Sequence, residues 1–140
     1  MSNIQKIKCI KKKIIYHHKR NIMKYIKKSD ENYLNFGEVY FSWIKRNKFK
    51  GWKFHKKMHM NLTVPVGNVK FTFFDETSQK KIIFSLSEKK FGILYVPPKI
   101  WFGFQNMSKS KNSLIVNFTN IVHDKKESIN KESINKDFKR

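Results

Sequence analysis

The chain has 140 residues, with 31 lysines and arginines against 10 acidic residues and a formal net charge of +21. This length fits a single domain, and 39% hydrophobic residues, among them 13 phenylalanines, are enough for a folded core, which excludes a globally disordered chain. The single cysteine excludes an intrachain disulfide and a cysteine-based zinc site. No apolar run approaches the roughly 18 residues of a membrane span, so we expect a cytoplasmic protein with no membrane partner.

The basic residues are mostly lysines, since only Arg20, Arg46 and Arg140 are arginines. Nucleic-acid interfaces favour arginine, because its planar fork binds phosphates and guanine edges with two hydrogen bonds. We therefore interpret most of the charge as a solvated, lysine-rich surface. The alternative is that the positive charge attracts a polyanion, either nucleic acid or a phosphorylated small molecule.

Short strands are predicted along most of the chain. Residues 1–28 alternate lysine with isoleucine or tyrosine, and residues 38–44 are aromatic and β-branched, which is typical of strands. Residues 52–66 alternate most regularly, with apolar residues at even positions except Lys56 and a polar row at odd positions from Lys53 to Thr63. Gly67 and Asn68 predict a turn, with residues 69–74 as the returning strand of a hairpin. Further strands are expected at 81–86, 92–96 and 113–119.

At least seven short strands and no convincing amphipathic helix predict an all-β sandwich or barrel, formed as a single domain by residues 1–125. The composition changes after this segment. Residues 126–135 repeat the pentapeptide Lys-Glu-Ser-Ile-Asn twice, and one isoleucine per repeat buries little surface. We expect residues 126–140 to be a charged tail that is disordered or a frayed helix.

Three segments carry a resemblance to a known family. They are Phe-Gly-Glu-Val-Tyr-Phe-Ser at 36–42, Lys-Gly-Trp-Lys-Phe-His-Lys-Lys-Met at 50–58 and Val-Pro-Pro-Lys-Ile-Trp-Phe-Gly-Phe at 96–104. With Gly67 and residues 117–124, their order resembles the cupin family of dTDP-4-dehydrorhamnose 3,5-epimerases, and specifically its short members. The second segment is also similar to the Arg-Gly-x-His-x-His-Lys-Lys motif of the sugar 3,4-ketoisomerase branch. The resemblance covers about residues 14–127.

This resemblance implies a cupin jelly-roll-like β-barrel that binds a nucleotide-diphosphate sugar of the dTDP-4-keto-6-deoxyhexose type, used in surface polysaccharide synthesis. It also implies a homodimer formed by exchange of an N-terminal strand. In the family, a base removes a proton from the carbon beside the ketone, an enolate forms, and the proton returns from the other face. Such chemistry needs a base with a near-neutral pKa and a donor or cation for the enolate oxygen.

The chain departs from the family's catalytic pattern. Lys53 stands where the family has its histidine base, Phe102 stands at the second histidine, and residues 119–122 lack the tyrosine acid. The repeat tail occupies the region of the acidic partner. The second histidine of the ketoisomerase pair is retained as His55. Epimerase-like or isomerase-like turnover, binding without turnover, a catalytically inactive cupin and a basic nucleic-acid-binding module therefore all stay open.

His55 and Lys53 are the candidate catalytic residues, because they lie two apart on one face of the predicted strand. Crowding with Lys57 and His59 would lower the pKa of each group, so that either could act as the base. The candidate substrate-binding residues are lysines that pair with a diphosphate, polar neighbours in the row, and a tryptophan that stacks on a ring. They are Lys50, Lys57, His59, Asn61 and Trp101.

We predict no metal and no other cofactor. Metal-binding cupins need a His-x-His pair, a glutamate and a later histidine, and here Lys53 replaces the first of these. His55 and His59 on one strand would lie about 13 Å apart, which is too far to share an ion. Trp52 falls on the apolar face of the same strand, so we assign it to the core.

Overall fold

The computed structural model describes residues 2–133, which contain twelve β-strands and two short 3-10 helices. In chain order they are η1 (Asn3–Lys6), β1 (Lys8–Lys11), β2 (Ile14–Ile15), β3 (Ile22–Met23), β4 (Glu38–Ile44), β5 (Phe49–His55), β6 (Met60–Val66), β7 (Asn68–Asp75), β8 (Lys80–Ser87), β9 (Gly92–Val96), β10 (Trp101–Asn106), β11 (Ser113–Thr119), η2 (Lys125–Glu127) and β12 (Ser128–Asn130).

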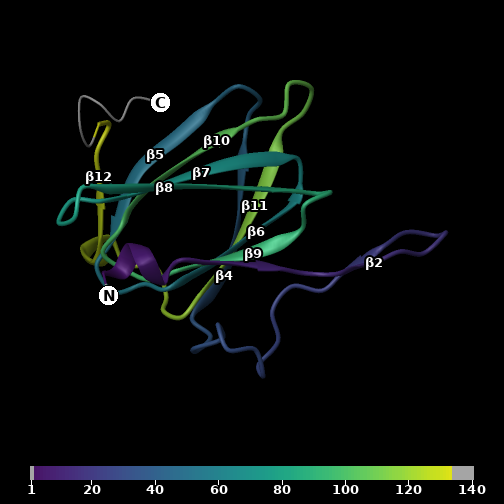
Figure 1. Ribbon diagram of the computed structural model, residues 1–140, viewed down its shortest axis with the longest axis horizontal. Helices are drawn as coiled ribbons and strands as arrows, with labels where there is room; N and C mark the ends of the chain where they lie inside the picture. Colours follow the sequence, from purple (N-terminus) through teal and green to yellow (C-terminus); the bar gives the residue numbers. More distant parts are fainter. Residues whose placement is uncertain (1, 134–140) are drawn as a thin grey trace.

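Ten of these strands form two five-stranded antiparallel sheets, and the other two, β2 and β3, form a hairpin that projects from the body (Figure 1). The first sheet has the order β1-β9-β6-β11-β4, and the second has the order β12-β5-β10-β7-β8. The sheets face each other around a common interior. The predicted all-β, single-domain, jelly-roll-like barrel is confirmed.

The main core lies between the two sheets, where each strand turns its apolar side chains inward. Phe71 and Phe73 of β7 are fully buried and pack with Met60 and Leu62 of β6. Burying each side chain of this size contributes about 1.5–3 kcal/mol. Phe74 follows Phe73 directly and points to the other face of the second sheet, because successive side chains in a strand alternate. There it joins a second buried cluster with Trp52 and Trp101.

The hairpin predicted around Gly67 is wrong, because β6 belongs to the first sheet and β7 to the second. Gly67 joins them with a φ of +93°, in the left-handed region that favours glycine. Residues 52–66 are likewise not one strand, since β5 ends at His55 and β6 begins at Met60 in the opposite sheet. Alternation identifies a strand but carries no information about which strand pairs with it.

The beginning of the repeat tail is ordered, in contrast to the disordered or frayed tail predicted from residue 126. Asp124 caps η2 by accepting from the Lys126 backbone N–H, and β12 pairs antiparallel with β5. Trp52 and Lys131 exchange backbone hydrogen bonds of 2.7 and 2.9 Å beyond this ladder. The first repeat therefore covers the edge of β5, whose backbone groups would otherwise lack partners in the sheet. Residues 134–140 of the predicted tail lie outside the described residues.

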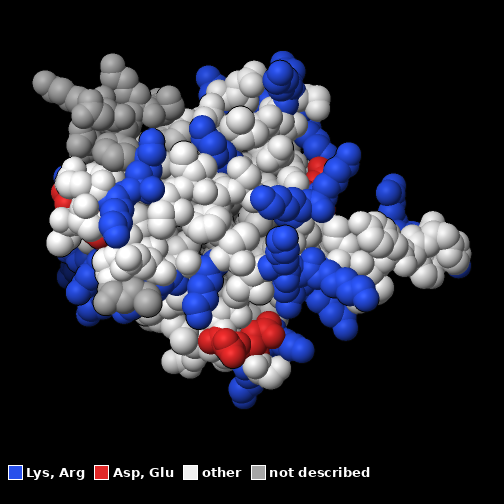
Figure 2. Space-filling view, in the orientation of Figure 1, with Lys and Arg blue, Asp and Glu red and all other residues white. Residues whose placement is uncertain are grey.

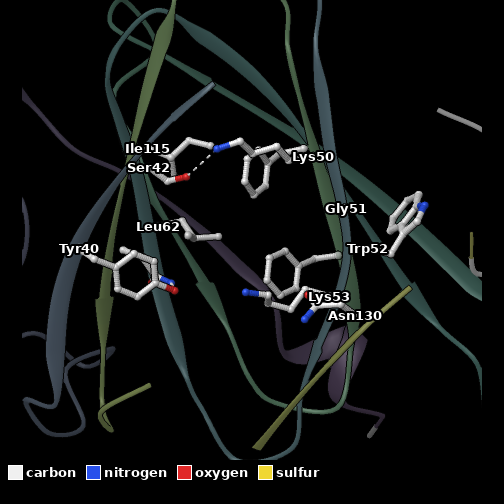
Figure 3. A pocket seen from close by; sticks show the side chains of 12 residues that line it. Tyr40, Ser42, Lys50, Gly51, Trp52, Lys53, Leu62, Ile115 and Asn130 are labelled. Carbon is white, nitrogen blue, oxygen red and sulfur yellow. Dashed lines mark hydrogen bonds between the residues drawn. The ribbon is translucent and has the colours of Figure 1, made fainter. Parts of the chain in front are cut away.

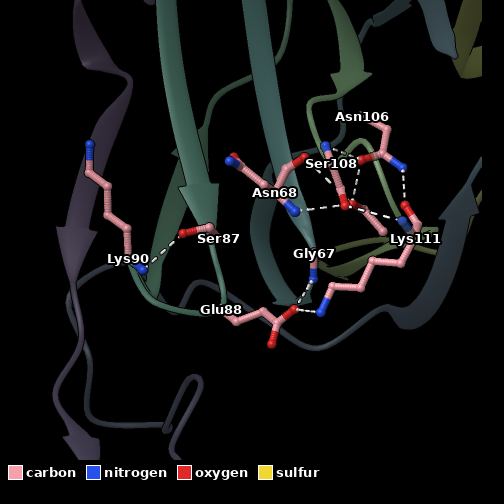
Figure 4. A network of polar contacts seen from close by, with 9 residues as sticks. Gly67, Asn68, Ser87, Glu88, Lys90, Asn106, Ser108 and Lys111 are labelled. Atoms are coloured by element: carbon pink, nitrogen blue, oxygen red, sulfur yellow. Dashed lines mark hydrogen bonds and ion pairs between the residues drawn. The ribbon is translucent and has the colours of Figure 1, made fainter. Parts of the chain in front are cut away.

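A polar network joins the sheets at one end of the barrel (Figure 4). The Glu88 carboxylate accepts from the Gly67 backbone N–H at 2.8 Å and forms an ion pair with Lys111. The Asn106 amide donates to the Ile44 carbonyl at 3.0 Å. These contacts tie the β6–β7 crossing and the end of β4 to the loop before β11, and so hold the two sheets together at this end.

The face of the molecule seen in Figure 2 is basic, with lysines and arginines separated by uncharged residues. Figure 2 shows lysines and arginines scattered among uncharged residues over one face, and they are densest beside the base of the projecting hairpin. This distribution fits the lysine-rich surface inferred from the composition. Within residues 2–133, no helix has the length and apolar character needed to cross a membrane.

Candidate functional site

A cavity of about 300 Å³ lies between the two sheets, at the lower end of the volumes that hold small molecules. Figure 3 shows lysine side chains from β5 on one side of it and Tyr40 of β4 on the other. The first sheet contributes Tyr40, Ser42, Leu62, Ile115 and Asn117 to the wall, and the second contributes Lys50, Gly51, Trp52, Lys53, Phe102, Phe104 and Asn130. The lining thus combines apolar side chains with polar groups from both sheets.

Two lysines of β5 bring positive charge to this cavity. Lys50 reaches across to β4, where its ammonium donates to the Trp43 carbonyl at 2.6 Å and contacts the Ser42 hydroxyl at 3.4 Å. Lys53 is half-buried and extends toward the interior beside Asn130, its partner on β12. A phosphorylated or enolate oxygen inside the cavity would meet these ammonium groups.

His55 and Glu127 form a buried pair at the end of β5. The His55 side chain is 2% exposed, and its Nδ1 contacts the Glu127 carboxylate. The second carboxylate oxygen accepts from the backbone N–H groups of Lys57 and Met58, both at 3.0 Å. Burial acts to raise the pKa of Glu127, but these donors together hold it below its usual value. Glu127 is therefore ionised at neutral pH.

The same burial sets the state of His55. Burial lowers the pKa of the His55 imidazole, while Glu127 acts to raise it and the Lys53 charge lowers it further, with a net decrease. A neutral imidazole whose Nδ1–H donates to Glu127 leaves Nε2 with a lone pair. That Nε2 is buried and has no hydrogen-bond partner among residues 2–133. The ring stacks on Phe102 of the cavity wall, with centroids 5.7 Å apart.

The sequence predicts a lowered pKa for His55 from crowding with other cations and from desolvation together. In the structure, desolvation is the largest cause, and Lys53 makes a smaller contribution. Burial also accounts for the lowered pKa of His59, which has no cationic cause.

Lys53 and His55 share one face of β5, as the spacing predicts, but the row does not continue into the cavity. Lys57 is exposed in the loop between β5 and β6. The His59 ring bonds the Tyr95 hydroxyl at 2.8 Å, and the buried Asn61 exchanges hydrogen bonds with Asn32. None of these three predicted binding residues lines the cavity. The odd-numbered Lys53 and His55 of β5 face the interior, but after the intervening loop the even-numbered residues of β6, such as Leu62, face it instead.

Trp101, predicted to stack on a ligand, lies outside the cavity. It points from β10 to the outer face of the second sheet, where it packs in the cluster with Phe74 and Trp52. Its indole N–H donates to the Glu76 carboxylate, and the Lys131 ammonium lies 4.9 Å from its ring centre. The Trp52 indole also points away from the cavity (Figure 3), in agreement with its assignment to the core.

Sequence reasoning missed three residues of the site: Glu127, Tyr40 and Asn117. Glu127 was hidden in the repeat, because Glu132 occupies the same place in the second copy. The alternation of residues 38–44 places Tyr40 and Ser42 on the same face of a strand, but no local pattern shows whether that face points to the interior of the barrel or to its surface. Within residues 2–133, no three His, Cys, Asp or Glu side chains are grouped so that they could hold a metal ion.

The described residues define a small cupin-type barrel with a ligand-sized cavity between its sheets. The sequence matches the family described as FdtA: WxcM-like, C-terminal, over residues 3–140, and the chain belongs to this family. No curated protein matches the sequence.

Three solved structures show what the chain resembles. A dTDP sugar isomerase from Desulfovibrio desulfuricans G20 has a TM-score of 0.85 and 25% identity, over 89% of this chain and 83% of that chain. QdtA, a sugar 3,4-ketoisomerase from Thermoanaerobacterium thermosaccharolyticum, has a TM-score of 0.75 and 20% identity, over 90% and 88%. The dTDP-4-dehydrorhamnose 3,5-epimerase from Sulfolobus tokodaii has a TM-score of 0.77 and 19% identity, over 87% and 74%. The resemblance to both cupin branches and the cupin fold are confirmed.

Proposed function

We propose that this protein binds a dTDP-4-keto-6-deoxyhexose-type sugar between its sheets and acts on it as an isomerase or epimerase in surface polysaccharide synthesis. The observation that carries the proposal is the His55–Glu127 pair. His55 does not itself line the cavity, but its imidazole, with an unpartnered Nε2, stacks on Phe102 in the wall of a cavity supplied with two lysines. Two similar structures support the substrate class. One is a dTDP sugar isomerase, and QdtA was crystallised with TDP and, as a variant, with TDP-4-keto-6-deoxyglucose.

In the proposed reaction, His55 Nε2 takes the proton from the carbon beside the ketone. The electron pair of that C–H bond forms a C=C bond, and the ketone oxygen becomes an enolate. Glu127 stabilises the imidazolium, and the Lys53 ammonium stabilises the enolate. Return of the proton to the same carbon from the other face inverts that centre. Return of the proton to the former ketone carbon, with transfer of the neighbouring hydroxyl's proton to the enolate oxygen, moves the ketone to the neighbouring position.

The diphosphate of the nucleotide would need cationic partners at the cavity. Lys53 and Lys50 supply them, and they act as point charges that tolerate several phosphate orientations. Lys50 already spans the cavity from β5 to β4, so that an incoming phosphate can share its ammonium with the Trp43 carbonyl.

A homodimer is part of the proposal. The outer face of the first sheet exposes an apolar row on its edge strand β4, made of Val39, Phe41 (68% exposed) and Trp43 (54% exposed). The paired residues of β11 beside this row, Leu114, Val116 and Phe118, are half-buried or buried. A contiguous apolar patch of this kind marks an interaction surface, and a second copy of this chain would cover it. Light scattering of the unmodified protein and of Phe41→Glu tests this part, and a monomeric unmodified protein would contradict it.

Ligand choice is tested first by thermal shift with dTDP-, UDP- and GDP-sugars and a short oligonucleotide. Stabilisation by one sugar nucleotide supports the proposed site. A shift with the oligonucleotide alone, falling steeply with salt, would replace the proposal by the nucleic-acid-binding alternative.

Turnover is tested by exchange of deuterium from D2O into dTDP-4-keto-6-deoxyglucose. We expect His55→Ala to slow exchange by about 10²–10⁴-fold, the usual contribution of a positioned base, and Lys53→Ala to slow it as well. His59→Ala is a matched control, because its imidazole pKa is also lowered but its ring bonds the Tyr95 hydroxyl, whereas His55 stacks on Phe102 of the cavity wall. Unchanged exchange in both His55→Ala and Lys53→Ala would refute the catalytic roles.

A further inference from the structure

Tyr40 and Asn117 form a hydrogen-bonded pair on the cavity wall opposite Lys53. They are direct partners in the pairing of β4 with β11, and the Asn117 amide donates to the Tyr40 hydroxyl at 2.8 Å. Figure 3 shows Tyr40 and Lys53 on opposite sides of the same space. The two residues come from the first sheet, whereas His55 and the lysines come from the second.

Each side chain of this pair can form one further hydrogen bond. The Tyr40 hydroxyl accepts from Asn117, so its own hydrogen is available to another acceptor. The Asn117 side chain is 3% exposed, and its Oδ1 has no partner among residues 2–133. In that part of the chain, the two buried side-chain polar atoms without a partner are this Oδ1 and His55 Nε2. Asn117 lines the cavity, so a ligand there could satisfy its Oδ1, and the His55 ring stacks on Phe102 of the same cavity wall.

The buried surroundings keep Tyr40 a donor. Burial raises the pKa of the Tyr40 phenol, the Asn117 hydrogen bond opposes this, and the charges of Glu38 and Glu127 add to the increase. The phenol therefore keeps its proton at neutral pH. An ionised phenol could only accept, whereas a protonated one presents a donor beside the Asn117 acceptor.

We propose that the Tyr40 hydroxyl and Asn117 Oδ1 together recognise an α-hydroxy ketone, with Tyr40 donating to the ketone oxygen and Asn117 accepting from the neighbouring sugar hydroxyl. This inference rests on the proposed function and specifies which atoms of the sugar the first sheet contacts. A donor and an acceptor held side by side match the adjacent C=O and C–OH groups, which a simple ketone or a simple alcohol would satisfy only in part.

The pair also has a consequence for the reaction. When His55 removes the proton, the C–H electron pair forms the C=C bond and negative charge develops on the ketone oxygen. The hydrogen bond from Tyr40 strengthens as this charge grows, and Tyr40 keeps its proton throughout. When the proton returns to carbon, the charge disappears and no other reactant is consumed. Tyr40 is then a catalytic residue, and Asn117 positions its hydroxyl.

The test compares Tyr40→Phe with Tyr33→Phe. Tyr33 is a matched control, because its ring packs on Phe118 and it does not line the cavity. Removal of one oxyanion donor slows enzymes by about 10²–10³-fold, so we expect Tyr40→Phe to slow deuterium exchange into dTDP-4-keto-6-deoxyglucose by that factor. Calorimetry should show dTDP affinity unchanged within about twofold, since dTDP has no ketone to bind.

A binding measurement separates the failure of this inference from the failure of the proposed function. Affinity for the keto sugar nucleotide relative to dTDP should fall about tenfold in Tyr40→Phe and in Asn117→Leu, the effect of losing one hydrogen bond. Exchange in Tyr40→Phe at the unmodified rate, or an unchanged affinity ratio in both variants, would overturn the inference and leave the proposed function standing. An unmodified protein that neither exchanges deuterium nor prefers the keto sugar would refute both.

Discussion

Replacing Glu127 by alanine is expected to be the most destabilising single change at the site. The carboxylate is buried and accepts three hydrogen bonds, from His55 and from the backbone N–H groups of Lys57 and Met58. Hydrogen bonds to a charged group contribute about 1.5–3 kcal/mol each, and breaking a buried ion pair costs about 3–5 kcal/mol. Because Glu127→Ala also relieves the desolvation of the carboxylate, we expect a loss of about 3–5 kcal/mol.

Urea unfolding followed by tryptophan fluorescence measures this loss. Glu132→Ala is the control, because Glu132 has the same place in the second repeat but is exposed, and surface changes usually stay within about 0.5 kcal/mol. Glu127→Gln keeps a carbonyl acceptor without the charge and should fall between the two. Equal stabilities of Glu127→Ala and Glu132→Ala would show that the buried pair does not hold β12 and the end of β5 as described.

Three further predictions follow from burial, location and backbone geometry. The lowered pKa of His55 means that the unfolded chain binds this proton first as the pH falls below the ordinary value of 6.5. The free energy of unfolding should therefore decrease from pH 7 to pH 5, and less so in His55→Gln, when measured in urea. Trp101→Phe loses the hydrogen bond to Glu76, which should lower the free energy of unfolding by about 1 kcal/mol. Calorimetry should show unchanged affinity for the sugar nucleotide. A lost affinity would place this ring in the cavity. Gly67→Ala should lower the free energy of unfolding by about 2–4 kcal/mol, because Gly67 has a φ of +93° and an added Cβ would lie 2.0 Å from the Ser113 hydroxyl oxygen. Calorimetric unfolding measures this loss, and a variant of unchanged stability would contradict the tight crossing between the sheets.

Much of the strand content could be predicted from local patterns. The predicted segments 38–44, 92–96 and 113–119 coincide with β4, β9 and β11. Their aromatic and β-branched residues favour extended backbone wherever the strand is placed. The same local rule put Lys53 and His55 on one face of β5, because side chains two apart in a strand point the same way.

The rest of the site depended on the path of the chain between elements. The loop at 56–59 takes the chain from the second sheet to the first and reverses which parity faces the interior. For this reason Asn61 turned away from the cavity although it continues the polar row, and Leu62 faces inward. A periodic pattern cannot show such a reversal, since the loop interrupts the period itself.

The amino-acid order alone determined that this chain forms short strands with one apolar face, because alternation and β-propensity act between near neighbours. Its motifs, taken in order, also determined the cupin family. Only the tertiary structure decided which strands pair, that Glu127 rather than Glu132 meets His55, and that Tyr40 and Asn117 share a wall of the cavity. These pairs join residues 72 and 77 positions apart. Contacts over such separations depend on how the two sheets close on each other, and they leave no local signal in the sequence.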